Sequence, residues 1–385
     1  MHEQLINGES NSMNKNTSIP TLTIIIPVYN GEKYIEATVQ NIFRSSFQNL
    51  ELLLIDDGST DRSPEICDKC ARLDARIRVF HKPNEGIAKT RNFGLDHASG
   101  DYIGFCDQDD EISADMYGTM IDRIVSDGSH AAICGCYRKK QHDKTVVYEE
   151  YTDALLEGEA VRDKLLYPML FRGFDEHTNE EIRIYPTIWK CIISRQFARE
   201  NRLMFKSFVN HEDDLIMLTL LLLKADKIST LSHIFYYWNT NVDSETFHFR
   251  GRYINDLEHR QMLFTDYMEN LLIDHAVPTD IIRKYVYTLH CRNALEVLDN
   301  TALSHEKYAA KMRRLHHNQS IVSIRTSKDH VGPHKGFVRN RLIIPLLRKG
   351  HIIYAYFLNR VINYIRFFVE KHHVAEVLER RIKKA

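Results

Sequence analysis

The sequence has no long apolar run, and this absence limits the kinds of protein that it encodes. No segment reaches about eighteen uninterrupted apolar residues, so we expect no membrane-spanning helix. The first twenty residues are polar and contain no apolar stretch resembling the core of a signal peptide. We therefore expect residues 1–20 to form a disordered tail and the protein to stay in the cytoplasm.

Cysteine is scarce, with 7 residues in a chain of 385. An odd number without an export signal favours reduced thiols over a disulfide framework. Cys67 and Cys70 form a CxxC pair, but no second pair and no nearby pair of histidines would complete the four ligands of a zinc site. The formal net charge of -1 gives no reason to expect a nucleic acid or a strongly acidic partner.

Two glycine-rich turns are also missing. The segment Pro27–Glu32 follows the first apolar run and lacks the GxGxxG turn, which excludes a dinucleotide-dependent dehydrogenase. A glycine-rich phosphate loop with Arg and Lys is absent from the N-terminal region, which argues against a sugar nucleotidyltransferase. Such an enzyme would nevertheless have an α/β half and an acidic metal site, and this sequence indicates both, so it remains an alternative.

What the chain does contain is a regular alternation of short apolar runs and longer periodic stretches from Thr21 onward. This pattern is typical of an α/β domain with a parallel sheet and crossover helices, in which ligands bind at the carboxyl ends of the strands. The expected strands are 22–27, 51–55, 77–80, 102–106 and 131–136, and the expected helices are 32–45, 63–73, 87–98 and 114–126.

The alternation weakens after about residue 140, where an irregular and charge-rich stretch begins. We expect one helix at 213–224, an aromatic strand at 233–238 and successive helices beyond about residue 250. A chain of this length exceeds what one core usually organises. The sequence therefore predicts a catalytic domain over 21–250 and a helical accessory region over 251–385, with the boundary near 245–255.

Polar side chains follow three of the expected strands. The first strand ends in Pro27, Tyr29 and an amide, and the tyrosine ring there could stack on a nucleobase. The second runs into Asp57, whose carboxylate could accept a hydrogen bond from a ribose hydroxyl or a base N–H. An ordinary strand end followed by a helix cap explains the same residues without a ligand.

The strongest signal is the acidic cluster after the strand at 102–106. Asp107, Gln108, Asp109 and Asp110 follow one another directly, and like charges so close repel one another unless a cation is present. Mg²⁺ and Mn²⁺ take one or two protein carboxylates and complete their shell with water and phosphate oxygens. The cluster therefore indicates a divalent-metal and diphosphate site, with a surface acidic turn as the alternative.

In this order and spacing, the three segments resemble the family 2 glycosyltransferases with the GT-A fold over roughly residues 21–245. The resemblance continues from Asn84 and Gly86 through Arg91 to the metal strand. It implies a nucleobase site at Tyr29 and Asp57 and a metal ligand at Asp109. It also implies that the donor-binding set comprises Pro27, Tyr29, Asp57, Asn84, Gly86, Arg91, Asp107 and Gln108.

The segment at 210–214, Asn-His-Glu-Asp-Asp, resembles the Glu-Asp motif of the same family. In that family the aspartate is the general base, which implies Asp213 here. Asp214 is its immediate neighbour, so an alignment slip of one residue would exchange their roles. An acidic helix start is equally well explained by the helix dipole.

The resemblance thus implies an inverting, metal-dependent hexosyltransferase that uses Mn²⁺ or Mg²⁺. Its donor would be a nucleotide-sugar, with uridine as the family's commonest base, and its acceptor a glycan or lipid-linked hydroxyl in cell-surface polysaccharide synthesis. Two features depart from the family: Asn239 stands near a position that is often basic, and the processive-synthase signature Gln-x-x-Arg-Trp is missing, which favours single additions. A non-catalytic nucleotide-sugar-binding protein is the further alternative.

The C-terminal part is strongly basic. The segment from Lys335 to the end contains twelve Lys and Arg and only three Glu. Apolar and aromatic residues are interspersed among them at helical spacing. Such a helix could lie on an anionic membrane at the inner face of the plasma membrane, where a lipid-linked acceptor would be presented. Packing of the same stripe on the protein itself is the alternative. Nothing in the sequence specifies an oligomeric state.

Overall fold

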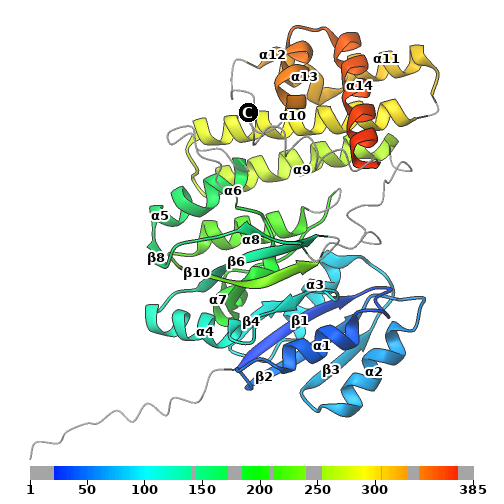
Figure 1. Ribbon diagram of the computed structural model, residues 1–385. Helices are drawn as coiled ribbons and strands as arrows, with labels where there is room; N and C mark the ends of the chain where they lie inside the picture. Colours follow the sequence, from blue (N-terminus) through cyan, green and yellow to red (C-terminus); the bar gives the residue numbers. More distant parts are fainter. Residues whose placement is uncertain are drawn as a thin grey trace, which may run out of the picture.

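The computed structural model describes residues 21–140, 144–171, 184–208, 212–239, 254–304, 306–327 and 338–371. A mixed α/β sheet domain carries a layer of helices on one side, at the top of Figure 1. The expected tail 1–20 lies outside the described residues. So does most of the expected domain boundary at 245–255, since the chain resumes at Ile254.

The first half of the sheet is parallel, in the order β3-β2-β1-β4. Its strands are almost continuously apolar because helices cover both faces, as a buried parallel sheet requires. The strands and helices expected here are confirmed to within a few residues: β1 Leu22–Val28, α1 Ile35–Phe43, β2 Leu50–Asp56, α2 Ser63–Leu73, β3 Ile77–His81, α3 Ile87–His97 and β4 Tyr102–Phe105.

The second half of the sheet is mixed, with parallel and antiparallel neighbours. β9, Cys191–Ser194, lies antiparallel between β4 and β6, Ala131–Lys140. β10, Lys227–Asn239, runs parallel to β6 and contains the expected aromatic strand. Shorter antiparallel strands complete the sheet: β5 Glu111–Ile112, β7 Lys144–Glu149 and β8 Ala154–Glu157.

Short helical segments connect these strands. α8 begins and ends where it was expected, at Asp213–Lys224. The others are α4 Met116–Asp127, α5 Glu159–Val161, the π-helix η1 Arg162–Leu166, α6 Tyr167–Phe171, the 3₁₀ helix η2 Ile188–Lys190 and α7 Arg195–Glu200.

Beyond residue 253 all described elements are helices, in agreement with the expected helical region. They are α9 Ile254–Asp274, α10 Thr279–Leu303, α11 Tyr308–His317, α12 Gln319–Thr326, α13 Val338–Arg348 and α14 Ile352–Lys371. None of the helices in the described ranges is both long enough and apolar enough to cross a membrane.

The main hydrophobic core continues from the sheet into this helical layer. Phe264, Met268 and Leu272 of α9 and Tyr285 of α10 belong to the same buried cluster as the strands β1 and β2. A second, smaller cluster lies among the later part of α10 and α11–α14. The first two helices of the layer therefore pack as part of the sheet domain's core.

Candidate active site

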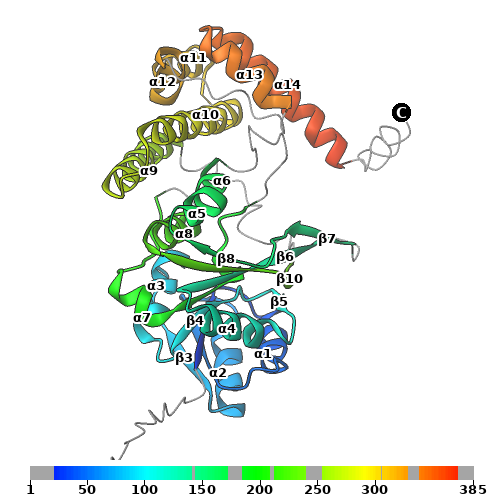
Figure 2. The same cartoon turned by 90° about the vertical axis from the view of Figure 1, so that its left-hand side faces the viewer.

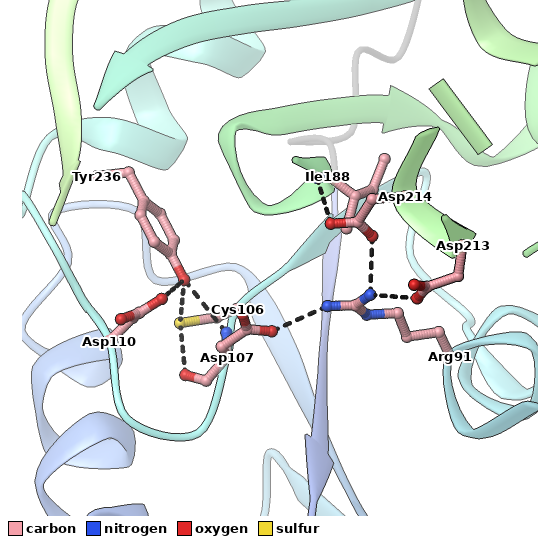
Figure 3. Close-up of polar contacts among 8 residues, drawn as sticks. All are labelled: Arg91, Cys106, Asp107, Asp110, Ile188, Asp213, Asp214 and Tyr236. Atoms are coloured by element: carbon pink, nitrogen blue, oxygen red, sulfur yellow. Dashed lines mark hydrogen bonds and ion pairs between the residues drawn. The ribbon is translucent and has the colours of Figure 1, made fainter. Parts of the chain in front are cut away.

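Arg91 lies at the centre of three carboxylates that come from two distant parts of the chain (Figure 3). Its Nη1 donates to Oδ2 of Asp213 at 2.8 Å and to Oδ1 of Asp214 at 2.7 Å, and its Nη2 donates to Oδ1 of Asp107 at 3.0 Å. The Arg91 side chain is only 4% exposed. Burial lowers its pKa, but the three carboxylates outweigh burial and hold the pKa above its usual value.

The backbone brings Arg91 to this position through a close contact between α3 and the sheet. A Cβ at Gly94 would lie 2.5 Å from Cγ2 of Ile25, so only glycine allows this approach of α3 to β1. Gly86 precedes the helix with a φ of 88°, which favours glycine, and its carbonyl accepts the Thr90 N–H. The close approach at Gly94 therefore holds α3, and with it Arg91, against the sheet.

The two adjacent aspartates at the start of α8 are not equivalent. Both oxygens of Asp214 are occupied, Oδ1 by Arg91 and Oδ2 by the N–H of Ile188 at 3.2 Å. Asp213 uses Oδ2 for Arg91, and its Oδ1 has no hydrogen-bond partner in the part of the chain that the structure describes. Burial raises the pKa of Asp214 to about 7; Asp213 and Asp107 add to that rise, and Arg91 opposes it. Asp213 is thus the aspartate with an oxygen left to accept a proton.

In the acidic loop after β4, which comprises residues 107–110, some side chains point outward and others point into the protein. Asp110 is buried: its Oδ2 accepts the Tyr236 hydroxyl at 2.8 Å and its Oδ1 accepts the Asn239 N–H at 2.8 Å. The same hydroxyl accepts the N–H of Asp107 at 3.2 Å, as Figure 3 shows. Burial, with the charges of Asp107 and Asp109, raises the pKa of Asp110 well above its usual value. Asp110 therefore anchors the loop, and the side chain of Asp107 stays 31% exposed beside Arg91.

Hydrogen bonds with Tyr29 of one segment and Asn239 of another hold Gln108 and Asp109 in place. Oε1 of Gln108 accepts the N–H of Tyr29 and its Nε2 donates to the carbonyl of the same residue, both at 3.0 Å. A Cβ at Gly31 would collide with Oε1 of Gln108, so the clamp requires glycine there. Nδ2 of Asn239 donates to the carbonyl of Asp109 at 2.7 Å. Asn239, at the position that is often basic in the family, thus fixes the acidic loop.

Tyr29 is 39% exposed at the end of β1, in a position to present its ring to a ligand. Pro27 does not end the strand, contrary to the sequence interpretation: it still pairs with Ile55 of β2. On the opposite edge of β1, which faces β4, the carbonyl of Ile25 accepts the N–H of Cys106. Because successive residues alternate sides, the missing N–H of Pro27 faces a side where the ladder to β4 has already ended.

Asp57 is buried and holds the loop that follows β3. Its Oδ1 accepts the N–H of Glu85 at 3.0 Å, its Oδ2 accepts that of Gly86 at 2.8 Å, and Lys82 donates its ammonium. A Cβ at Gly58 would lie 2.7 Å from the backbone nitrogen of Asn84. Asp57, Asn84 and Gly86 therefore form one unit, in which the carboxylate shapes the loop.

The structure thus brings the expected site residues into two groups. Arg91, Asp107 and Asp213 are in direct contact, and Gln108 joins them to Tyr29 through the acidic loop. Asp57, Asn84 and Gly86 form the second group at the neighbouring strand ends. Sequence reasoning missed Lys82 and the anchoring roles of Tyr236 and Asn239. It also missed Trp189, whose ring stacks on that of Tyr236, and the buried ion pair of Lys190 and Glu149. Lys82 carries a signal because it directly follows a strand, and Asn239 carries one because it stands near a position that is often basic in the resembling family.

The described residues hold no group of three His, Cys, Asp or Glu that could bind a metal ion by itself. The acidic loop still fits Mg²⁺ or Mn²⁺, because such ions use one or two protein carboxylates and take the other oxygens from phosphate and water. Asp107 keeps one oxygen beyond its bond to Arg91, and Asp109 is partly exposed next to it. Asp110 does not qualify, since both of its oxygens point inward.

A mixed sheet with acidic loops at the carboxyl ends of its parallel strands defines a GT-A type transferase fold, followed here by a helical region. The crystal structure of S. aureus TarS 1-349 superposes with a TM-score of 0.56 over 89% of this chain and 91% of that one, at 17% sequence identity. The same protein in complex with UDP-GlcNAc gives a TM-score of 0.52 at 15% identity. At these identities the likeness shows the fold.

The family follows from the sequence match. Residues 23–177 match Glycosyl transferase family 2, and this part of the chain belongs to that family. The uncharacterized glycosyltransferase EpsJ of Bacillus subtilis is 30% identical over 228 residues, which is 59% of this chain and 63% of EpsJ. An uncharacterized glycosyltransferase of Haemophilus influenzae is 48% identical over 109 residues, or 28% of this chain and 44% of that relative. The match thus spans less than two thirds of each relative's length.

Proposed function

We propose that the protein is an inverting, metal-dependent glycosyltransferase that moves a hexose from a nucleoside-diphosphate donor to a hydroxyl of a glycan or lipid-linked acceptor in cell-surface polysaccharide synthesis. One observation carries the proposal: Arg91 joins the acidic loop after β4 to the start of α8, so that Asp107 and Asp213 share one cation. A transferase needs these two groups together, one near the leaving diphosphate and the other near the attacking hydroxyl.

The donor end is assigned to the loops after β1, β2, β3 and β4. Tyr29 would stack on the base, and the loop shaped by Asp57 would border it. Gln108, Pro27, Asn84, Gly86 and Arg91 complete the donor set. The complex of TarS with UDP-GlcNAc supports uridine as the first base to test. Asp109, with Asp107 beside it, would hold Mg²⁺ or Mn²⁺, which when bound neutralises charge on the departing diphosphate.

The acceptor end is assigned to Asp213. As the acceptor oxygen attacks the anomeric carbon, Oδ1 of Asp213 takes its proton, the new C–O bond forms and the bond from that carbon to the diphosphate oxygen breaks. The electron pair of the broken bond leaves with the nucleoside diphosphate. Arg91 keeps the other oxygen of Asp213 in place. A single displacement inverts the configuration and requires no second nucleophile.

A panel of nucleotide-sugars with Mn²⁺ or Mg²⁺, read by nucleoside-diphosphate release, tests the proposal. We expect Asp109→Ala to lose metal-dependent donor binding. We expect Asp213→Ala to bind donor normally and to transfer about 10²–10⁴-fold more slowly, the usual contribution of a general base. Asp96→Ala on the exposed side of α3 is the matched control and should keep both properties.

Three results would contradict this assignment in distinguishable ways. Unchanged transfer by Asp213→Ala would reject Asp213 as the general base. If only Asp214→Asn lost transfer, the general base would be Asp214. Release of pyrophosphate in place of the nucleoside diphosphate identifies a nucleotidyltransferase. Donor binding without turnover on any acceptor identifies a non-catalytic nucleotide-sugar-binding protein.

A further inference from the structure

α14 is apolar on two opposite sides. Its inner side packs into the second core cluster through Ile352, Ala355 and Tyr356. Its outer side exposes six large apolar residues, each between 46% and 71% exposed: Ile353, Tyr354, Phe357, Val361, Tyr364 and Ile365. At 3.6 residues per turn these positions fall on one side of the helix, and we call them the outer stripe. A surface helix of a globular protein ordinarily carries polar residues there.

The outer stripe extends onto the neighbouring helix α11. The ring of Tyr308, which is exposed at the start of α11, lies 6.2 Å from the ring of Phe357 between centroids. Figure 2 shows the C-terminal half of α14 projecting past the ends of α9 and α10. The stripe therefore lies on a part of the molecule that a flat surface can reach.

The sequence of α13, α14 and the turn between them carries charge of almost a single sign. Residues 338–371 contain seven Arg and Lys and one acid, Glu370. Arg360 lies at the edge of the stripe, one turn from Tyr364, with its guanidinium 5.9 Å from the ring of Tyr356. Arg341 on α13 and Lys349 directly after that helix are exposed, and α13 packs against α14. The surface thus combines apolar and aromatic side chains with a border of cations.

We propose that this surface of α13 and α14 binds an anionic lipid bilayer, with the outer stripe between headgroups and acyl chains and the cations on lipid phosphates. Binding would hold α14 parallel to the bilayer, because aromatic and aliphatic side chains emerge along its length. The inference rests on the proposed function, since it names the place where a lipid-linked acceptor would meet the transferase. A second copy of the chain fits less well, because a twofold contact would set these cations against one another.

The full-length protein tests the proposal by flotation with vesicles of phosphatidylcholine, with or without phosphatidylglycerol. We expect flotation with the anionic vesicles only, and a loss of at least about tenfold in the triple variant Tyr354→Ser, Phe357→Ser, Tyr364→Ser, because buried apolar area drives the insertion. The matched control replaces two exposed apolar residues of α9, Leu263→Ser and Ile273→Ser, and should float like the unmodified protein.

A second variant examines the charges separately. Arg341→Gln with Lys349→Gln should weaken binding to anionic vesicles about fivefold for each base removed, and added salt should weaken binding of the unmodified protein. Unchanged flotation of both variants would overturn the proposal. So would a stripe variant that turns an oligomer into a monomer in light scattering and floats as before.

Failure of this inference is separable from failure of the proposed function. Without vesicles, the stripe variant should release nucleoside diphosphate on a water-soluble acceptor at the unmodified rate, since none of its residues touches the candidate active site. Nucleotide release without flotation would reject the membrane surface and leave the transferase intact. Flotation without nucleotide release would reject the transferase and leave the membrane surface intact.

Discussion

Arg91 is the residue on which the candidate active site depends most directly. It is buried, and its guanidinium makes three charge-assisted hydrogen bonds to Asp107, Asp213 and Asp214. A planar guanidinium can serve carboxylates in different directions at once, which a lysine ammonium on a flexible stem does less well. The same side chain therefore fixes the geometry of the site and stabilises buried negative charge.

We predict that Arg91→Met lowers the free energy of unfolding by about 3–5 kcal/mol, because it leaves buried carboxylates without their partner. Urea unfolding at neutral pH measures the loss. Lys89→Met, two residues earlier on the same helix, removes an exposed pair with Glu85 and should cost less than about 0.5 kcal/mol. Equal stability of the two variants would show that Arg91 does not hold the cluster together.

At the scale of single residues, the sequence predicted which residues belong to the site, but it did not predict the contacts that they make. The acidic loop and Asp213 were identified from short motifs that resemble a family pattern. Arg91 was expected to bind donor, and its bond to Asp213 was not expected, because 122 positions separate the two residues. Asp57 likewise holds the loop of Gly86, since buried carboxylates take the nearest N–H groups.

At the scale of elements, the 3₁₀ helix η2 links the two ends of the candidate active site. The N–H of Ile188 donates to Asp214, and the ring of Trp189 stacks 4.0 Å from that of Tyr236, which anchors the acidic loop. Nζ of Lys190 donates to both oxygens of Glu149 on β7, at 2.5 and 2.6 Å. Both members of this ion pair are fully buried, so η2 is tied to the sheet by charge as well as by packing.

We predict that Lys190→Met destabilises the protein by about 3–5 kcal/mol, since it leaves the Glu149 carboxylate buried without its partner. Burial already raises the pKa of Glu149 against the opposing effect of Lys190, so the carboxylate would take up a proton in the variant. Adding Glu149→Gln should restore much of the loss. Thermal and urea unfolding of the single and double variants measure both effects.

The exposed pair of Lys139 and Glu111 supplies the control for this prediction. Lys139→Met removes a cation whose side chain is one third exposed, and should change stability by less than about 1 kcal/mol. A double variant as unstable as Lys190→Met alone would mean that lost packing, and not the unpaired charge, causes the effect.

Elements were predictable where local signals agree. α2 has the bounds that were expected from the sequence, with proline in its first turn, and in the structure an extended Asp74 ends it. η2 and β9 were not expected: η2 has three residues and β9 has four, too few to show a period. Their positions depend on contacts with β4, β6 and β7, which no local pattern records.

At the scale of the whole molecule, the hydrophobic core does not divide where the sequence changes character. After about residue 250 the sequence pattern predicts only helices. In the structure, α9 and the first part of α10 nevertheless pack into the core of the sheet domain. The ring of Phe208 lies 6.1 Å from that of Phe264, and Phe171 lies 6.3 Å from Tyr285. Arg292 of α10 also approaches Glu212, next to Asp213, at 3.9 Å. The helices thus contact the start of α8, which carries the proposed base.

This continuity predicts how two shortened chains behave. A chain that ends at residue 253 loses Phe264, Met268, Leu272 and Tyr285, and each such side chain contributes about 1.5–3 kcal/mol by burial. Together they approach the total stability of about 5–15 kcal/mol of an ordinary domain. We expect this chain to aggregate or to unfold without a cooperative transition. A chain that ends at residue 304 keeps those side chains and loses only helices of the second cluster.

The longer of the two chains should therefore unfold cooperatively and bind nucleotide-sugar with the affinity of the full protein. Differential scanning calorimetry and isothermal titration with donor, on both chains and the full protein, compare the three. Cooperative unfolding of the chain ending at 253, with unchanged donor affinity, would show that the sheet domain is complete without α9 and α10. Loss of donor binding in the chain ending at 304 would instead require α11–α14 to shape the donor site, although the residues assigned to that site lie on other elements.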